Sequence, residues 1–181
     1  MGHGGDVIDE LSADLREIED LFTRIGGLAP GDERLRGLAD RLTGELVRYA
    51  VTEEEYLFPA VRRFVDDGDD MADQELADRA ETDRLIRELE SCPPADARFT
   101  ALVASLGAAT ERLASERAGR LFPLLSESCP PRILAELGER VRASRERPGQ
   151  SPAPRPVGVL LGAGAGAVVP LPEGGEPDAR D

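Results

Sequence analysis

Histidine, lysine, asparagine and tryptophan are scarce or missing in this chain of 181 residues. Lysine, asparagine and tryptophan do not occur, so arginine supplies all 22 basic side chains, and the only histidine is His3. A single histidine ahead of the first predicted helix excludes the catalytic sets in which histidine activates a serine or cysteine. It also leaves the helical core without the commonest metal ligand.

Positive charge is in short supply as well. The chain has 36 acidic residues against 22 basic ones, a net charge of -14, which argues against nucleic acid as a partner because that binding relies on basic groups. No apolar run reaches the roughly 18–20 residues of a membrane span. The first residues have no basic segment followed by an apolar one, so no secretory signal is expected. Two cysteines give no disulfide framework, and we predict a cytoplasmic protein.

What the chain does contain favours helices. Hydrophobic residues make up 40% of it and aromatic residues only 4%, a composition typical of a helical protein with a small aliphatic core. Apolar residues recur with the 3.6-residue period of an amphipathic helix through most of the sequence. This period predicts four long helices and a shorter fifth after Pro130-Pro131, the long ones at about residues 6–26, 33–65, 71–91 and 96–127.

An internal repeat groups the long helices in two pairs. A shift of 64 residues places Leu57-Phe58-Pro59 on Leu121-Phe122-Pro123, together with several other matching residues. Two copies of a helix pair bury their apolar stripes best as a bundle with an approximate twofold axis. We therefore predict an all-α fold, a four-helix up-down bundle made of two repeated helix pairs plus a short C-terminal fifth helix. Each proline is expected to interrupt its helix.

The last part of the chain has a different composition. From residue 147 on it is rich in Pro, Gly, Ser and Ala, and such segments bury too little apolar surface to offset their ordering entropy. We predict a bundle over residues 1–146 and a disordered tail over 147–181. The alternative is that the apolar stretch Val157 to Leu171 docks on a partner or on the bundle. Cys92 and Cys129 lie at opposite ends of the fourth predicted helix, too far apart to pair, and are expected as free thiols.

Two features resemble a known family. The repeated Leu-Phe-Pro segments and the opening string Met-Gly-His-Gly-Gly-Asp-Val-Ile-Asp-Glu-Leu are similar to bacterial hemerythrin-like proteins with the HHE cation-binding domain. The resemblance covers about residues 1–145. It implies a di-iron centre inside the bundle, held by five histidines and two carboxylates, and a protein that senses or carries oxygen, nitric oxide or iron.

The ligand positions that the resemblance implies are filled mostly by residues that do not bind metals. These positions hold Leu15, Tyr49, Glu53, Arg79, Asp83, Leu113 and Arg117. Two carboxylates beside two guanidinium groups cannot hold two irons. We therefore expect no metal, no cofactor and no catalytic residue, so that the chain is not an enzyme. A functional metal-binding sensor or carrier is the alternative.

Four of these side chains are charged although they fall on apolar stripes: Glu53, Arg79, Asp83 and Arg117. Unpaired buried charges are strongly destabilising. We hypothesise that the four form an Arg–carboxylate network that replaces the metal at the centre of the bundle; the alternative is that they lie at stripe edges and extend to solvent. The predicted function is a non-catalytic binding, structural or regulatory bundle with a protein partner that the sequence does not identify.

Overall fold

A computed structural model gives the fold of residues 4–146, so His3 and the predicted tail at 147–181 lie outside the described residues. The part that it describes is helical and contains no strand. Its elements in chain order are α1 (Val7–Gly26), α2 (Arg34–Thr52), η1 (Glu53–Leu57), α3 (Phe58–Phe64), α4 (Gly68–Ser91), α5 (Arg98–Glu116), η2 (Arg117–Leu121), α6 (Phe122–Ser128) and α7 (Pro131–Arg145).

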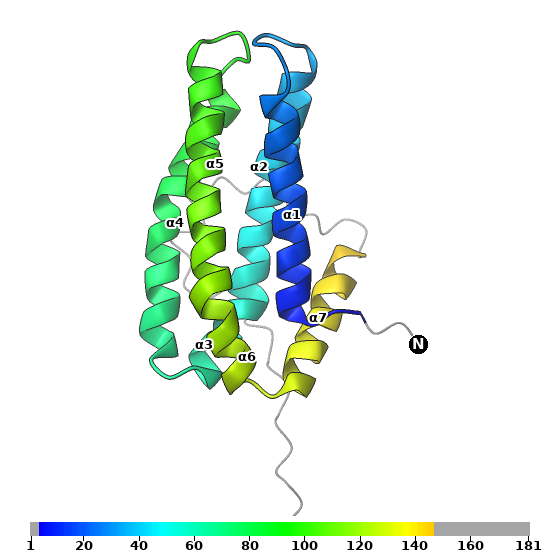
Figure 1. Cartoon of the computed structure of the whole chain (residues 1–181), viewed down its shortest axis with the longest axis vertical. Coiled ribbons are helices and arrows are strands. Elements are labelled where there is room, and N and C mark those ends of the chain that lie inside the picture. The colour runs from blue at the N-terminus through cyan, green and yellow to red at the C-terminus, as the bar shows by residue number, and fades with distance from the viewer. Residues whose placement is uncertain (1–3, 147–181) are drawn as a thin grey trace, which may run out of the picture.

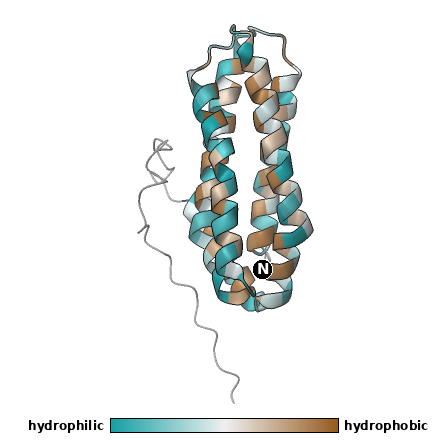
Figure 2. Cartoon of the chain, turned by 90° about the vertical axis from the view of Figure 1, so that its left-hand side faces the viewer, coloured by the Kyte–Doolittle hydropathy of each residue, from teal (hydrophilic) through white to brown (hydrophobic). Residues whose placement is uncertain are grey.

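The predicted all-α bundle is confirmed. The four long helices α1, α2, α4 and α5 run side by side, and the loops that end α1 and α4 lie at the same end of the molecule (Figure 1). Helix α1 packs on α2 and α4 packs on α5, while α1 also meets α5 and α2 also meets α4. Hydrophobic residues gather on the sides of the helices that face one another, and hydrophilic residues cover the outside (Figure 2). The aliphatic core therefore lies between the two helix pairs.

The two halves of the repeat begin their second helices in the same way. The Asp32 carboxylate accepts a hydrogen bond from the backbone N–H of Arg34 at 2.9 Å, and Asp96 accepts one from the N–H of Arg98 at 2.8 Å. In each pair the arginine side chain also folds back onto the same carboxylate. These hydrogen bonds from Arg34 lower the pKa of Asp32 to about 2. They satisfy an N–H that a helix start leaves without a partner.

Pro59 and Pro123 each interrupt a helix, as the sequence predicts, and the interruption is a π-helical turn. The turns η1 and η2 stand directly before α3 and α6, in which proline is the second residue. Each turn closes with a hydrogen bond to the carbonyl five residues back, from the N–H of Phe58 to Glu53 and from that of Phe122 to Arg117. Proline cannot donate to the α-helical ladder, so a single wider turn accommodates it.

Helix α7 covers the first helix and the start of the chain. Its buried side chains include Ile133, Leu137 and Val141, which are the residues that the sequence places on its apolar stripe. Arg142 donates to the backbone carbonyl of Gly5 at 2.7 Å and pairs with Glu10 at 2.6 Å. The fifth predicted helix is thus held against α1 by both apolar packing and ion pairs.

Both cysteines are free and buried, as the sequence predicts. Burial raises the pKa of the Cys129 thiol to about 11, which keeps it protonated and unreactive near neutral pH. Among residues 4–146, none of the helices is long and apolar enough to cross a membrane.

The close approach of α7 to α1 depends on a glycine. A Cβ added to Gly138 would lie 2.5 Å from the carbonyl oxygen of Gly5 and 2.7 Å from the carbonyl carbon of Asp6, and both are backbone atoms. We expect Gly138→Ala to lower the free energy of unfolding by about 1–3 kcal/mol, because the backbone must move to admit the methyl group. Urea denaturation measures the change. Gly44→Ala in α2 is the control, since its Cβ meets nothing within 4 Å and alanine favours a helix; an equal loss in both variants contradicts this account.

Candidate functional site

The centre of the bundle contains a cavity of about 40 Å³ between the four long helices. All seven positions at which the family resemblance implies metal ligands lie on its wall. The complete lining consists of Leu15, Leu46, Val47, Tyr49, Ala50, Glu53, Arg79, Thr82, Asp83, Ile86, Thr110, Leu113, Ala114 and Arg117. The residues singled out from the sequence are thus brought together in space, around one small volume.

Glu53 is the centre of the charged side of this cavity. Its carboxylate is 1% exposed and accepts hydrogen bonds from two arginines. Arg117 donates through Nη2 to Oε2 at 3.0 Å and through Nε to Oε1, while Arg79 donates through Nη2 to Oε2 at 3.1 Å. Both oxygens are therefore engaged, and the two-pronged contact from Arg117 is the geometry that a guanidinium group makes best.

The two arginines are in turn held by further carboxylates and rings. Arg79 also pairs with Glu54 and lies 5.7 Å from the centre of the Phe58 ring. Arg117 approaches Glu75 at 3.5 Å and lies 6.0 Å from the centre of the Tyr49 ring. Each guanidinium group thus has two acidic partners and one aromatic neighbour, which offsets the cost of burying it.

The contact between Glu53 and Arg117 also crosses the axis of the repeat. The two residues are equivalent under the 64-residue shift, and each is the first residue of a π-helical turn. In a symmetric pair of helices the same residue type would stand at both positions, and two like charges would meet. Here one position is acidic and the other basic, so the equivalent positions attract each other directly.

Burial and charge shift the pKa of several groups at the site. Burial alone would lower the pKa of Arg117, but the charge of Glu53, its hydrogen bond to Arg117 and the charges of Tyr49 and Glu75 together outweigh it, and the pKa is raised. Burial raises the pKa of Tyr49, and the charge of Glu53 raises it further. Burial also raises the pKa values of Asp83 and Glu75, although Arg79 and Arg117 respectively oppose the shift. The site thus favours the charged form of Arg117 and disfavours ionisation of Tyr49, Glu75 and Asp83.

Three of the four charged residues named from the sequence form the network, and the fourth does not join it directly. Glu53, Arg79 and Arg117 are 1%, 6% and 2% exposed, so the alternative that they extend to solvent is wrong. In the described part of the chain no ion pair joins Asp83 to either arginine. Asp83 lies on the cavity wall, but Arg79 is directed at Glu53 and at the neighbouring Glu54 instead.

Sequence reasoning missed two members of the network. Glu54 follows Glu53 in an acidic run that is typical of a solvated helix face, yet it pairs with Arg79. Glu75 lies one helical turn before Arg79 on α4 and faces Arg117 from there. The spacing of four between Glu75 and Arg79 was a usable sign, because residues four apart share a helix face.

The donor set at the cavity does not suit a metal ion. Within residues 4–146 no group of three or more His, Cys, Asp or Glu side chains is placed to hold one. The carboxylate that lies deepest, Glu53, has both oxygens engaged by guanidinium groups. A cation at this place would have to displace two guanidinium groups from Glu53. The leucines and the tyrosine on the wall do not replace histidine as metal ligands.

Comparisons with known proteins identify the class. The family model of the hemerythrin HHE cation-binding domain matches residues 6–125. The chain therefore belongs to the hemerythrin HHE cation-binding domain family, as the sequence resemblance implied. A crystal structure of a hemerythrin HHE cation-binding domain-containing protein from Mycobacterium kansasii is similar to this fold, with a TM-score of 0.70, 20% identity, and coverage of 86% of this chain and 90% of that one. A search of curated proteins found no match.

The central ion pair makes a direct prediction about stability. We expect Arg117→Leu to lower the free energy of unfolding by about 3–5 kcal/mol, because it removes the two-pronged partner of a buried carboxylate. Chemical denaturation measures this loss. Arg112→Leu is the control, since Arg112 on α5 pairs with Glu81 on α4 while both side chains are more than half exposed; it should cost less than about 1 kcal/mol. In the double variant with Glu53→Leu, strictly additive losses would contradict a coupled pair.

Asp83 makes a prediction about pH. Its raised pKa means that the native state binds its proton more tightly than the unfolded state does, so its ionisation costs stability as pH rises above 3.8. We expect the stability of Asp83→Asn, relative to the wild type, to increase between pH 4 and pH 7. Asp32→Asn should change in the opposite direction over about pH 2 to 3.8, because the pKa of Asp32 is lowered. Urea denaturation at a series of pH values tests both, and a flat difference for Asp83→Asn refutes the first.

Proposed function

We propose that this chain is a metal-free member of the HHE family, a non-catalytic bundle that serves as a binding or regulatory module. The observation that supports the proposal is the ion pair between Glu53 and Arg117. It lies among the positions where the resemblance implies metal ligands. An arginine in place of one carboxylate adds a fixed positive charge where a cation would have to bind.

The other lining residues support the same proposal. Leu15, Tyr49 and Leu113 stand where the resemblance implies histidines, and all three line the cavity. Leucine offers no lone pair to a metal, and burial raises the pKa of Tyr49 so that its hydroxyl stays protonated. Both oxygens of the Glu53 carboxylate are engaged by guanidinium groups, so the bundle does not need a metal to offset this buried acid.

The alternative is a functional metal-binding sensor or carrier of oxygen, nitric oxide or iron. The match to a cation-binding family over residues 6–125 is the observation that favours it. The Mycobacterium kansasii protein of similar fold is likewise named for a cation-binding domain. Family membership indicates a common backbone fold, whereas the side chains at the cavity argue against a bound metal ion.

The role that remains is one of association. We infer a cytoplasmic protein that is not an enzyme and that binds a protein partner, not nucleic acid, in keeping with its net charge of -14. Helix α7 already uses its apolar face and two of its arginines to hold α1. We propose that a partner contacts the outer face of α7 or the exposed acidic side chains of the bundle.

Metal analysis tests the proposal. The purified full chain is incubated with Fe(II) in air, freed of unbound iron, and measured by inductively coupled plasma spectrometry and visible absorption. We expect substoichiometric iron and no absorption of an oxo-bridged di-iron centre, because the arginines keep cations away from Glu53. An HHE protein with its histidines intact, treated in parallel, shows that the loading procedure works. Stoichiometric iron with that absorption in this chain would support the alternative.

A further inference from the structure

The central cavity has room for more than one water molecule. Its volume is about 40 Å³, whereas one water needs roughly 10–15 Å³ measured in this way. The space is therefore sufficient for about three waters, or for one organic molecule of about three to five non-hydrogen atoms. It touches all four long helices, so any occupant would contact both halves of the repeat.

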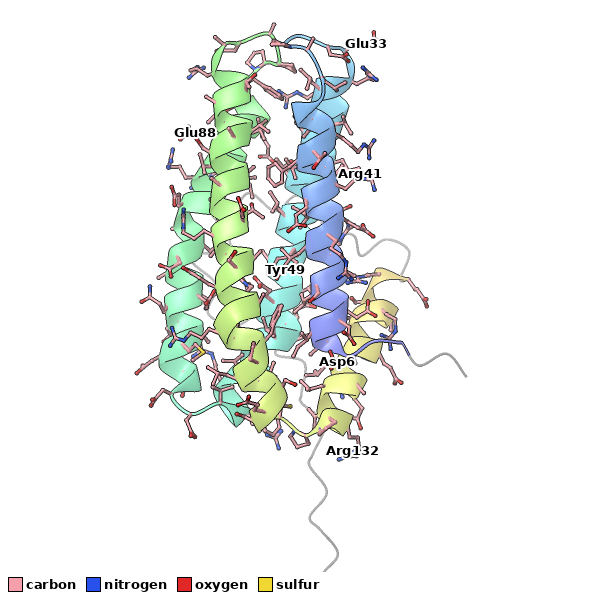
Figure 3. The ribbon with its side chains drawn as sticks, viewed as in Figure 1. Asp6, Glu33, Arg41, Tyr49, Glu88 and Arg132 are labelled. Atoms are coloured by element: carbon pink, nitrogen blue, oxygen red, sulfur yellow. The ribbon has the colours of Figure 1, made fainter. Side chains whose placement is uncertain are left out.

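Two buried hydroxyl groups on the wall have no partner. The hydroxyl of Tyr49 on α2 and that of Thr82 on α4 are buried and make no hydrogen bond with the described residues. Both residues are 7% exposed, and both line the cavity; Figure 3 shows Tyr49 between the long helices. Glu53 raises the pKa of Tyr49 through its charge and through the nearness of its carboxylate to the hydroxyl, but the two groups do not meet in hydrogen-bond geometry. Buried polar groups in native proteins nearly always have a partner, so two unpartnered hydroxyls around one hollow point to a molecule that bonds to them.

The charges at the cavity favour a neutral occupant. Both guanidinium groups are already engaged, Arg117 by Glu53 and Glu75 and Arg79 by Glu53 and Glu54. A carboxylate ligand would have to compete with these internal acids, and an ammonium ligand would lie beside two arginines. Much of the remaining wall is aliphatic, including Leu15, Leu46 and Leu113. The wall thus suits a molecule with one polar end and one apolar end.

We propose that the cavity binds a neutral molecule of three to five non-hydrogen atoms that carries one hydroxyl group, a short-chain alcohol being the simplest member of the class. Its oxygen exchanges hydrogen bonds with the hydroxyls of Tyr49 and Thr82, and its alkyl part contacts Leu15 and Leu113. The proposal rests on the proposed function in one respect, namely that no metal occupies this centre.

The experiment is a titration of the full, chelator-treated chain with 2-propanol, which has four non-hydrogen atoms. The readout is the methyl NMR signals of Leu15 and Leu113, which line the cavity. We expect shifts that saturate, with a dissociation constant in the high micromolar to millimolar range for so small a ligand. Acetate, of the same size but charged, should give no saturating shift.

Three variants separate a specific site from a general solvent effect. Tyr49→Phe and Thr82→Val remove the unpartnered hydroxyls and should each weaken binding about fivefold. Thr110→Val is the matched control, because Thr110 also lines the cavity but its hydroxyl already donates to the carbonyl of Leu106 at 2.8 Å; it should change binding less than about twofold. Circular dichroism checks that each variant is folded.

The outcomes are distinct from those of the metal test. Saturating shifts that are weakened in Tyr49→Phe and Thr82→Val but not in Thr110→Val support the proposal. Linear shifts, equal weakening in all three variants, or equal binding of acetate overturn it and leave water as the occupant. Iron uptake by the untreated chain would overturn the metal-free function, and it is measured in a separate sample without alcohol.

Discussion

The fold is organised around the ion pair that Glu53 and Arg117 form across the axis of the repeat. A charge buried in a bundle core is tolerated only when a partner of opposite sign is held close to it. These two residues occupy equivalent positions in the two halves of the repeat, so the ion pair joins the halves directly. Arg79 adds a second positive charge, which Glu54 balances on the side nearer to solvent. The four long helices therefore have to pack so that these charged side chains stay in contact.

The backbone around the pair is as symmetric as the sequence repeat, although the side chains are not. Both halves place a π-helical turn directly before a Phe-Pro segment, and both turns begin at a residue of the pair. A π-helical turn is rare by comparison with an α-helix and is often found at functional sites. In both halves the turn begins at a position where the family resemblance implies a metal ligand, and under the metal-free proposal this position carries one charge of the ion pair instead. Family membership and the side chains at these positions are thus compatible.

Much of this arrangement could be predicted from the sequence, because period and repeat are strong constraints. The apolar stripes define the helices, and the 64-residue shift brings Glu53 and Arg117 to equivalent places. What could not be predicted is the direction in which long side chains turn. Arg79 can reach Asp83 on its own helix or Glu53 and Glu54 on the neighbouring one, and only the distance between the helices decides. The π-helical turns could not be predicted either, because a proline indicates that a helix is interrupted but not how the backbone accommodates it.

The metal-free proposal also accounts for the cavity. Under the metal-free proposal, two leucines and a tyrosine stand where imidazole rings and an ion would otherwise fill the centre. Leucine is close to histidine in size, so removing the ion without much enlarging the residues leaves space. A void of about 40 Å³ costs on the order of 1 kcal/mol, much less than an unpaired buried charge. The pairing of Glu53 therefore contributes more to stability than filling the volume beside it would, and this volume is lined by Tyr49 and Thr82, whose hydroxyls have no partner among the described residues.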